Sequence, residues 1–167
     1  MSNANPAAGL PPRIELEKVM LLQGRVLALC GVSLRVEAGV TGVIGPNGSG
    51  KSSLFRVIAG LVRPRSGSVY VVGGNPLNDA QARNRVALVP SHDCFYQELS
   101  AERNLKIALL ARGYGGADLL KRIGRGLEST GLEDRAKEAC RTWSRGMRQR
   151  LKVAVAMASD AEVLLLD

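Results

Sequence analysis

The stretch Gly45–Ser52 reads Gly-Pro-Asn-Gly-Ser-Gly-Lys-Ser and matches the phosphate-loop pattern G-x-x-x-x-G-K-[ST]. Phosphate oxygens need several N–H donors at short range, and the three glycines allow the backbone to adopt φ > 0 and to approach them closely. Lys51 supplies a compact cation for the terminal phosphates, and the hydroxyl of Ser52 is a ligand that Mg²⁺ accepts beside substrate phosphates. The predicted binding residues are Gly45, Pro46, Asn47, Gly48, Ser49, Gly50, Lys51, Ser52 and Ser53.

The sequence on either side of this stretch predicts a strand, a loop and a helix. Residues 40–44, Val-Thr-Gly-Val-Ile, form a short β-branched run of the kind found in buried parallel strands. After the loop, apolar residues recur at helical spacing until Gly60 and Pro64 give stop signals. This order would point the N-terminus of a helix at the bound phosphates.

Composition restricts the class of protein but does not choose a partner. The chain has 167 residues, 46% hydrophobic and 23% charged, which is ordinary for a globular chain. Its net charge of +8 is compatible with nucleic acid, an anionic membrane surface or phosphate ligands. Aromatic residues make up only 4%, which argues against a stacking platform for single strands. The three cysteines are far apart and lack metal-ligand spacing, so we expect reduced thiols.

The rest of the chain predicts an α/β fold with a mixed sheet and a helical insertion. Residues 1–12 are expected to be a disordered leader. Apolar alternation or short apolar runs predict strands at 13–20, 32–36, 68–72 and 86–89. Helical spacing dominates from 99 to 159, with Ser100 as a possible N-cap. The predicted domain is therefore a core at 13–98 and 160–167 with a helical subdomain at 99–159.

A second chemical group is predicted at the last residues. Val163–Leu166 is an apolar run followed by Asp167, which places a carboxylate at the C-terminal end of a buried strand. In α/β sheets that edge is where ligands bind. A carboxylate there would hold Mg²⁺ opposite Ser52, in some cases through water.

A third candidate is the start of the helix that follows Trp143. Ser144 is a plausible N-cap, and Gly146 permits close approach of another backbone. A helix start of this kind suits an anion, while an ordinary basic amphipathic helix would have the same pattern.

Taken together, these residues resemble the nucleotide-binding domain of ATP-binding-cassette (ABC) transporters, over about Arg13 to Asp167. The resemblance implies a P-loop NTPase fold with ATP and Mg²⁺ as ligands, and Lys51 and Asp167 as catalytic residues. Residues 144–150 look like the signature variant of export-type cassettes that work with separate membrane subunits. This likeness to the signature implies that four residues act on the nucleotide of a second, head-to-tail subunit: Ser144, Arg145, Gly146 and Met147.

This sequence departs from the family pattern in several places. The aromatic residue that stacks on adenine is replaced by aliphatic residues around Met20. The family has a Gln that senses Mg²⁺ and the membrane subunit, and in this sequence Ser91, after Pro90, stands in its place. The only histidine, His92, is not the family's switch histidine, because it precedes the signature. The catalytic Glu would come after Asp167, so we expect a cassette whose C-terminal part is missing and whose 167 residues hydrolyse ATP barely above background.

The leading hypothesis is the ATP-binding subunit of a membrane export system, held at the inner face of the cell membrane by a permease subunit. That permease would grip the region around Ser91–Leu99. Two alternatives stay open: a nucleotide-binding fragment without turnover, and a soluble cassette ATPase that acts on ribosomes or DNA. Nucleic acid is the less favoured partner, because the soluble cassettes usually have two fused copies.

Overall fold

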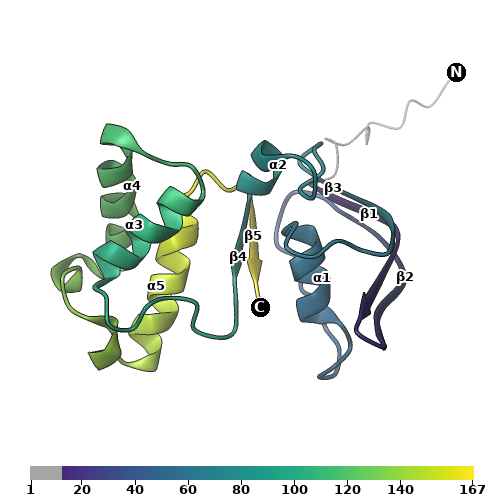
Figure 1. The fold of residues 1–167 in the computed structure, drawn as a ribbon, viewed down its shortest axis with the longest axis horizontal. Helices are drawn as coiled ribbons and strands as arrows, with labels where there is room; N and C mark the ends of the chain where they lie inside the picture. The colour runs from purple at the N-terminus through teal and green to yellow at the C-terminus, as the bar shows by residue number, and fades with distance from the viewer. Residues whose placement is uncertain (1–12) are drawn as a thin grey trace, which may run out of the picture. The chain divides into compact units, whose positions relative to one another are not determined.

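The computed structural model describes residues 13–167, which form two compact units that divide between Val86 and Ala87 (Figure 1). The leader predicted at 1–12 lies outside the described residues. Within the described part of the chain, no helix is long and apolar enough to cross a membrane.

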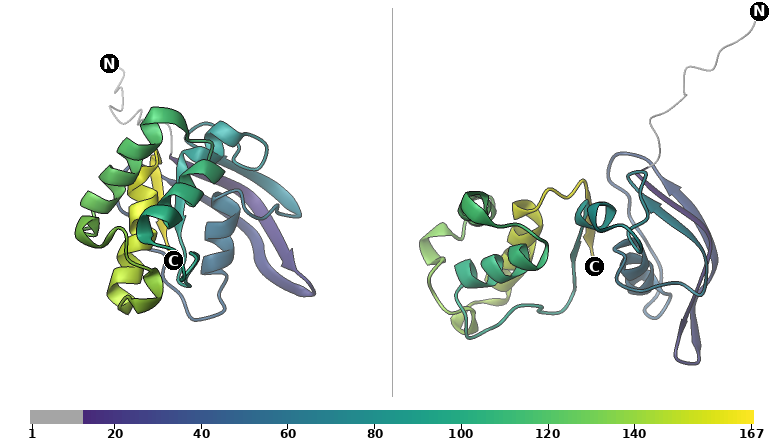
Figure 2. Two further views of the ribbon diagram at one scale, coloured as in Figure 1. Left: turned by 60° about the vertical axis from the view of Figure 1, so that its left-hand side comes forward. Right: turned by 45° about the horizontal axis from the view of Figure 1, so that its top comes forward.

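The first unit is built on a three-stranded antiparallel sheet in which β1 lies between β2 and β3. The apolar alternation predicted for β1 is confirmed, because Ile14, Leu16 and Val19 are buried. Two helices belong to this unit, and α1 lies along one face of the sheet (Figure 2). The elements are β1 (Ile14–Gln23), β2 (Val26–Val36), α1 (Lys51–Ile58), β3 (Ser66–Val71) and α2 (Ala80–Asn84).

The strand predicted at residues 40–44 is absent from this stretch of the described chain, and that prediction is wrong for this structure. Val40 and Ile44 are fully exposed, and these residues have no strand assignment. A β-branched run becomes a strand only when a neighbouring strand takes up its backbone hydrogen bonds. In this unit β1, β2 and β3 pair with one another, so the run is left without a strand partner.

The second unit combines a two-stranded sheet with a helical bundle. Strands β4 and β5 are hydrogen-bonded neighbours and run in the same direction (Figure 1). Ser100 caps α3 as predicted, since its Oγ accepts a hydrogen bond from the amide of Arg103 at 3.3 Å. The elements are β4 (Val86–Val89), α3 (Ala101–Ala111), α4 (Gly116–Glu128), η1 (Glu133–Arg135), η2 (Cys140–Thr142), α5 (Arg145–Ala158) and β5 (Val163–Leu166).

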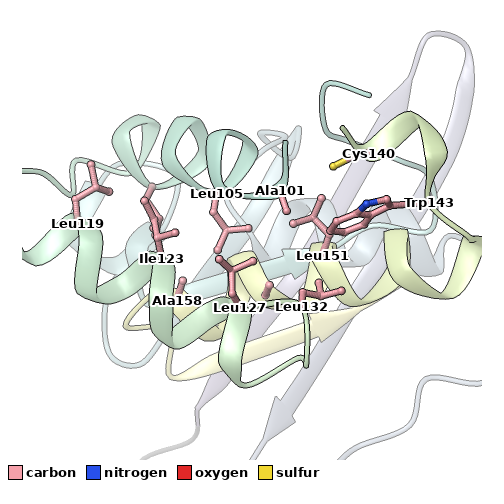
Figure 3. Packing of buried hydrophobic residues seen from close by; sticks show 12 residues of the cluster. Ala101, Leu105, Leu119, Ile123, Leu127, Leu132, Cys140, Trp143, Leu151 and Ala158 are labelled. Atoms are coloured by element: carbon pink, nitrogen blue, oxygen red, sulfur yellow. The ribbon is translucent and has the colours of Figure 1, made fainter. Parts of the chain in front are cut away.

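The three helices of the second unit enclose a hydrophobic core of their own (Figure 3). Leu105 of α3 and Leu151 of α5 are almost completely buried in it, and Trp143 packs beside Leu151. A fully buried leucine removes enough apolar surface from water to contribute roughly 1.5–3 kcal/mol. The helical subdomain predicted at 99–159 is helical as expected, while its status as an insertion into a core of 13–98 and 160–167 stays a prediction.

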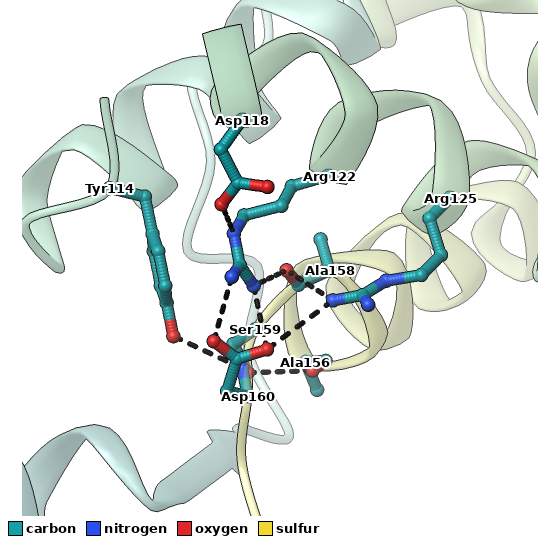
Figure 4. Close-up of polar contacts among 8 residues, drawn as sticks. All are labelled: Tyr114, Asp118, Arg122, Arg125, Ala156, Ala158, Ser159 and Asp160. Atoms are coloured by element: carbon teal, nitrogen blue, oxygen red, sulfur yellow. Dashed lines mark hydrogen bonds and ion pairs between the residues drawn. The ribbon is translucent and has the colours of Figure 1, made fainter. Parts of the chain in front are cut away.

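A polar cluster holds the end of α5 against α4, just before β5 begins (Figure 4). Arg122 makes a two-armed ion pair with Asp160, through Nη1 at 2.8 Å and Nη2 at 2.7 Å, and also pairs with Asp118. The Tyr114 ring stacks on the guanidinium of Arg122, and its hydroxyl accepts a hydrogen bond from the amide of Asp160. The hydrogen bond from Arg122 lowers the pKa of Asp160 below its usual range. The cluster therefore fixes where the chain enters the last strand.

Candidate functional site

The phosphate loop has the backbone that its glycines predict, with one exception. Gly48 has φ 81° and Gly50 has φ 93°, so both lie in the left-handed region that favours glycine. Gly45 is not among the residues of positive φ, so of the two features that the glycines allow it shows only the close approach. A Cβ at Gly45 would lie 2.8 Å from the Oγ of Ser49, and this close approach is what the missing side chain permits.

Gly50 also joins the loop to the sheet. A Cβ at this position would lie 2.5 Å from the carbonyl oxygen of Ala28 in β2, a distance that a real side chain cannot take up without movement. Its own carbonyl accepts the amide of Leu54 at 2.8 Å, which starts α1. The loop therefore packs directly on β2 at Gly50, the residue that precedes α1.

Lys51 places its ammonium over the loop that precedes it. Its Nζ donates to the carbonyl oxygens of Gly45 at 2.9 Å and Pro46 at 2.7 Å. The residue before α1 is Gly50, which has no side chain to cap the helix, and the first turn contains no acid. Uncapped N–H groups, the positive end of the helix dipole and a lysine therefore meet at one point. This combination fits a phosphate group and Mg²⁺ coordinated beside it.

The other predicted residues of the loop are accessible to a ligand. Pro46, Asn47, Ser49 and Ser52 are exposed, and Ser53 is half-buried. These residues can therefore be reached by a ligand from solvent. The structure brings all nine predicted residues of this loop into one continuous stretch around the start of α1.

In the second unit, the structure brings Ser91 and Asp167 to the same end of the two-stranded sheet. The amide of Asp167 donates to the carbonyl oxygen of Val89 at 3.0 Å, so the end of β5 lies beside the end of β4. Ser91 follows two residues after Val89, and both Ser91 and Asp167 are exposed. They occupy the carboxyl ends of neighbouring strands, where α/β proteins bind their ligands.

The predicted signature residues form the exposed start of α5. Ser144 is the N-cap, and its Oγ accepts a hydrogen bond from the amide of Met147 at 3.3 Å, as predicted. Arg145 and Gly146 are exposed, while Met147 is half-buried and packs against the helical core. In the described chain, the nearest atom to a Cβ built on Gly146 is the Oγ of Ser144, 4.0 Å away. The surface above Gly146 is therefore open.

Sequence reasoning missed Lys152, which is almost completely buried in α5. Its Nζ donates to three successive carbonyl oxygens, those of Pro90 at 2.9 Å, Ser91 at 3.2 Å and His92 at 3.3 Å. An unpaired buried ammonium costs several kcal/mol, whereas charge-assisted hydrogen bonds contribute about 1.5–3 kcal/mol each. The available signal was that Lys152 is the one charged residue in the run 151–158.

An ion pair supports the same loop. Asp93 lies 3.9 Å from the Nζ of Lys152 and 3.6 Å from Nη1 of Arg148, one helical turn earlier on α5. Burial raises the pKa of the neighbouring thiol of Cys94. The loop that follows β4 is therefore held by two basic residues of the helix that begins at Ser144.

The described residues contain no cluster of three or more His, Cys, Asp or Glu side chains able to hold a metal ion. The three cysteines are free, as predicted. Mg²⁺ does not need such a cluster, because it is commonly bound by one or two protein oxygens together with phosphate and water. Ser52 and Asp167 are oxygen donors of this kind, each in a different unit.

Two features define the class of protein. The phosphate loop leads into α1, and β5, much later in the chain, is followed directly by Asp167. Together they are typical of a P-loop nucleotide-binding protein. The family model described as "ABC transporter" matches residues 29–167, so the chain belongs to the ABC transporter family. Solved ATP-binding cassettes confirm the fold class. One is a dimeric cassette in a post-hydrolysis state with ADP and Pi, with 27% identity and a TM-score of 0.79 over 92% of this chain and 73% of that chain.

Relatives of similar sequence serve different transport systems. The chain is 34% identical to the methionine import ATP-binding protein MetN of Brucella abortus, over 97% of this chain and 46% of MetN. It is 36% identical to the Nod factor export ATP-binding protein I of Cupriavidus pinatubonensis, over 97% of this chain and 50% of that protein. The daunorubicin resistance ATP-binding protein DrrA3 of Streptomyces coeruleorubidus is 38% identical, over 84% of this chain and 45% of its own. The chain thus spans about half the length of these relatives.

Proposed function

We propose that this chain provides the ATP-binding and part of the ATP-hydrolysing machinery of an ABC transport system. The observation that carries the proposal is the ammonium of Lys51, which lies at the uncapped start of α1 and donates to Gly45 and Pro46. Phosphate oxygens accept hydrogen bonds more strongly than neutral carbonyls, because they are charged. Lys51 therefore exchanges its carbonyl partners for the terminal phosphates when ATP binds.

The other residues of the loop have separate tasks in this proposal. Amide N–H groups of residues 45–53, which Pro46 lacks, surround the phosphate chain, and the hydroxyl of Ser52 is a ligand of Mg²⁺. In the second unit, the carboxylate of Asp167 at the end of β5 and the hydroxyl of Ser91 after β4 are further oxygens suited to Mg²⁺. Bound Mg²⁺ neutralises phosphate charge during hydrolysis, and Lys51 does the same from the protein side.

Pairing with a second cassette is proposed from the exposed start of α5. Ser144 and Gly146 lie on open surface, and they present a helix start to a ligand that their own chain does not supply. In a head-to-tail pair related by a two-fold axis, each signature would face the phosphate loop of the other copy. One similar solved structure, the ATP-binding cassette with ADP and Pi, is a dimer, which supports this arrangement.

We propose export as the direction and a separate transmembrane subunit as the partner. Support comes from residues 144–150, which look like an export-type signature, and from the names of the Nod factor export and daunorubicin resistance relatives. The MetN relative is named for import, so relatives of similar sequence are named for both directions. The chain would then be peripheral to the inner face of the membrane, with its partner near residues 91–99.

A titration with a fluorescent ATP analogue tests the central part of the proposal. We expect Mg²⁺-dependent binding that Lys51→Ala weakens at least tenfold, because one lost charge-assisted hydrogen bond corresponds to about 1.5–3 kcal/mol. Arg56→Ala is the matched control, since it removes one exposed positive charge from the same helix. Equal affinities for the wild type and Lys51→Ala would refute the role of the phosphate loop.

A further inference from the structure

The loop after β4 is fixed to α5 by Lys152, whose ammonium uses all three of its N–H donors in this contact. A lysine ammonium has three N–H donors. Those of Lys152 meet the three carbonyl oxygens of Pro90, Ser91 and His92, which are consecutive in the chain. Only 3% of the side chain is exposed, so water does not compete for these donors.

The residues that pack α5 on β4 beside Lys152 are apolar. Its neighbours on α5, Val153 and Ala156, pack with Ala87 and Val89 of β4 in a small apolar cluster. The tip of Lys152 instead meets the three carbonyl oxygens and, at 3.9 Å, the carboxylate of Asp93, which an apolar residue would leave without this partner. What an apolar residue cannot do is turn three successive carbonyl groups toward the helix.

We infer that Lys152 is a positioning residue, which holds the backbone of residues 90–92 so that the hydroxyl of Ser91 has a fixed place beside Asp167. This inference rests on the proposed function. The Oγ of serine is one bond beyond Cβ, so its position follows the backbone closely. The carboxyl end of β4 is also held, because Val89 accepts the amide of Asp167. The loop is thus held by β5 at its start and by α5 along its length.

The same contact links the loop to the proposed signature. Lys152 lies eight residues after Ser144 on one continuous helix, a rise of about 12 Å. A helix of this length moves as a rigid rod, so a displacement at Ser144 is passed to the carbonyls of residues 90–92. Arg148, between the two, adds an ion pair to Asp93 at 3.6 Å. Because Lys152 holds the backbone of Ser91, a shift of α5 would also shift Ser91.

Lys152→Met tests the inference, because methionine keeps the length of the side chain and removes all three donors. The measurement is backbone hydrogen exchange, in the chain itself, at the hydrogen-bonded amides on either side of the loop: that of Tyr96, which donates to Oδ1 of Asn104, and that of Asp167, which donates to Val89. We expect exchange at least tenfold faster than in the wild type, with the protection of α3 and α4 unchanged. Lys121→Met is the matched control, since Lys121 is exposed on α4, and it should leave the exchange of this loop unchanged. Lys152→Gln keeps two N–H donors and should give an intermediate rate.

The functional measurement uses a version of the chain extended to the length of its relatives. Lys152→Met should lower kcat for ATP at least tenfold and leave KM within twofold, because the phosphate loop belongs to the other unit. Unchanged exchange at Tyr96 and Asp167, or faster exchange spread evenly over α3, α4 and α5, would overturn the inference. A change in KM alone would overturn it too. If the wild type fails to bind ATP, it is the proposed function that fails, and the exchange result still decides whether Lys152 holds the loop.

Discussion

Each region of this molecule contains a lysine that donates to successive main-chain carbonyls, but the two lysines differ in what they hold. In the region up to Val86, Lys51 bonds to carbonyls five and six residues earlier in its own loop. In the region from Ala87 onward, Lys152 bonds to carbonyls 60 to 62 residues away in another segment. Lys51 is partly exposed, whereas Lys152 is buried.

The difference separates a binding contact from a structural one. The partners of Lys51 face solvent, so a phosphate group can displace them at little cost. The partners of Lys152 are half-buried or exposed, but its ammonium is buried, and a buried ammonium that lost these partners would cost several kcal/mol. The first region is therefore built to exchange a ligand, and the second to keep its geometry.

The largest test of this contrast removes a core side chain from the second region. Leu105 is fully buried among α3, α4 and α5, so Leu105→Ala should lower the free energy of unfolding by roughly 2–5 kcal/mol. ATP affinity should stay within twofold of the wild type at temperatures where the protein is folded. Thermal unfolding and the ATP titration measure the two effects. A tenfold loss of affinity would break the contrast, since binding would then depend on the core of the second region.

A pair of glycine substitutions tests the first region. Gly48→Ala and Gly50→Ala both place a side chain at positive φ, which costs about 1–2 kcal/mol. Among the described residues, nothing lies within 4 Å of a Cβ at Gly48, whereas a Cβ at Gly50 meets the carbonyl of Ala28 at 2.5 Å. Forcing extra atoms into such a contact costs roughly 1–3 kcal/mol more. Urea unfolding should rank Gly50→Ala as the less stable variant, and the reverse order would show that the loop is not held against β2.

The phosphate loop, the cap of α5 and the acidic end of β5 were predictable because each is local in sequence. Ser144 and Met147 are three residues apart, and Asp167 follows its own strand directly. The single charge of Lys152 in the apolar run 151–158 marked the residue as unusual, but its partners could not be predicted, because they lie about 60 residues away in the sequence. The predicted strand at 40–44 failed for the same reason. Its residues favour a strand, but strand formation depends on a neighbour that propensity does not describe.

Two serine caps give a smaller and more selective test. Ser100 caps α3 and Ser144 caps α5, each by accepting a backbone amide at 3.3 Å. Replacing either serine with alanine should therefore cost about 1 kcal/mol of stability. Only Ser144→Ala should also weaken the ATP-dependent dimer, which sedimentation in Mg·ATP would measure in the chain extended to the length of its relatives. Equal effects of both variants on the dimer would reduce Ser144 to a helix cap.

The smallest expected effect concerns pH and the second region alone. Arg122 lowers the pKa of Asp160 in the folded protein, chiefly through its hydrogen bonds, with Arg125 adding to the same effect. A carboxyl group whose pKa is lower when folded stabilises the protein above its unfolded pKa of about 3.9, and this contribution is lost as the pH falls through the folded value. Because the side chain of Asp160 is 59% exposed, solvent screens the interaction and the effect stays small. Asp160→Asn should therefore lower the melting temperature at pH 7 by more than it does at pH 3. Asp134→Asn, an exposed control, should change it little at either pH. A difference between the wild type and Asp160→Asn that is the same at both pH values would show that the carboxylate charge contributes nothing, and that the cluster in Figure 4 acts through packing alone.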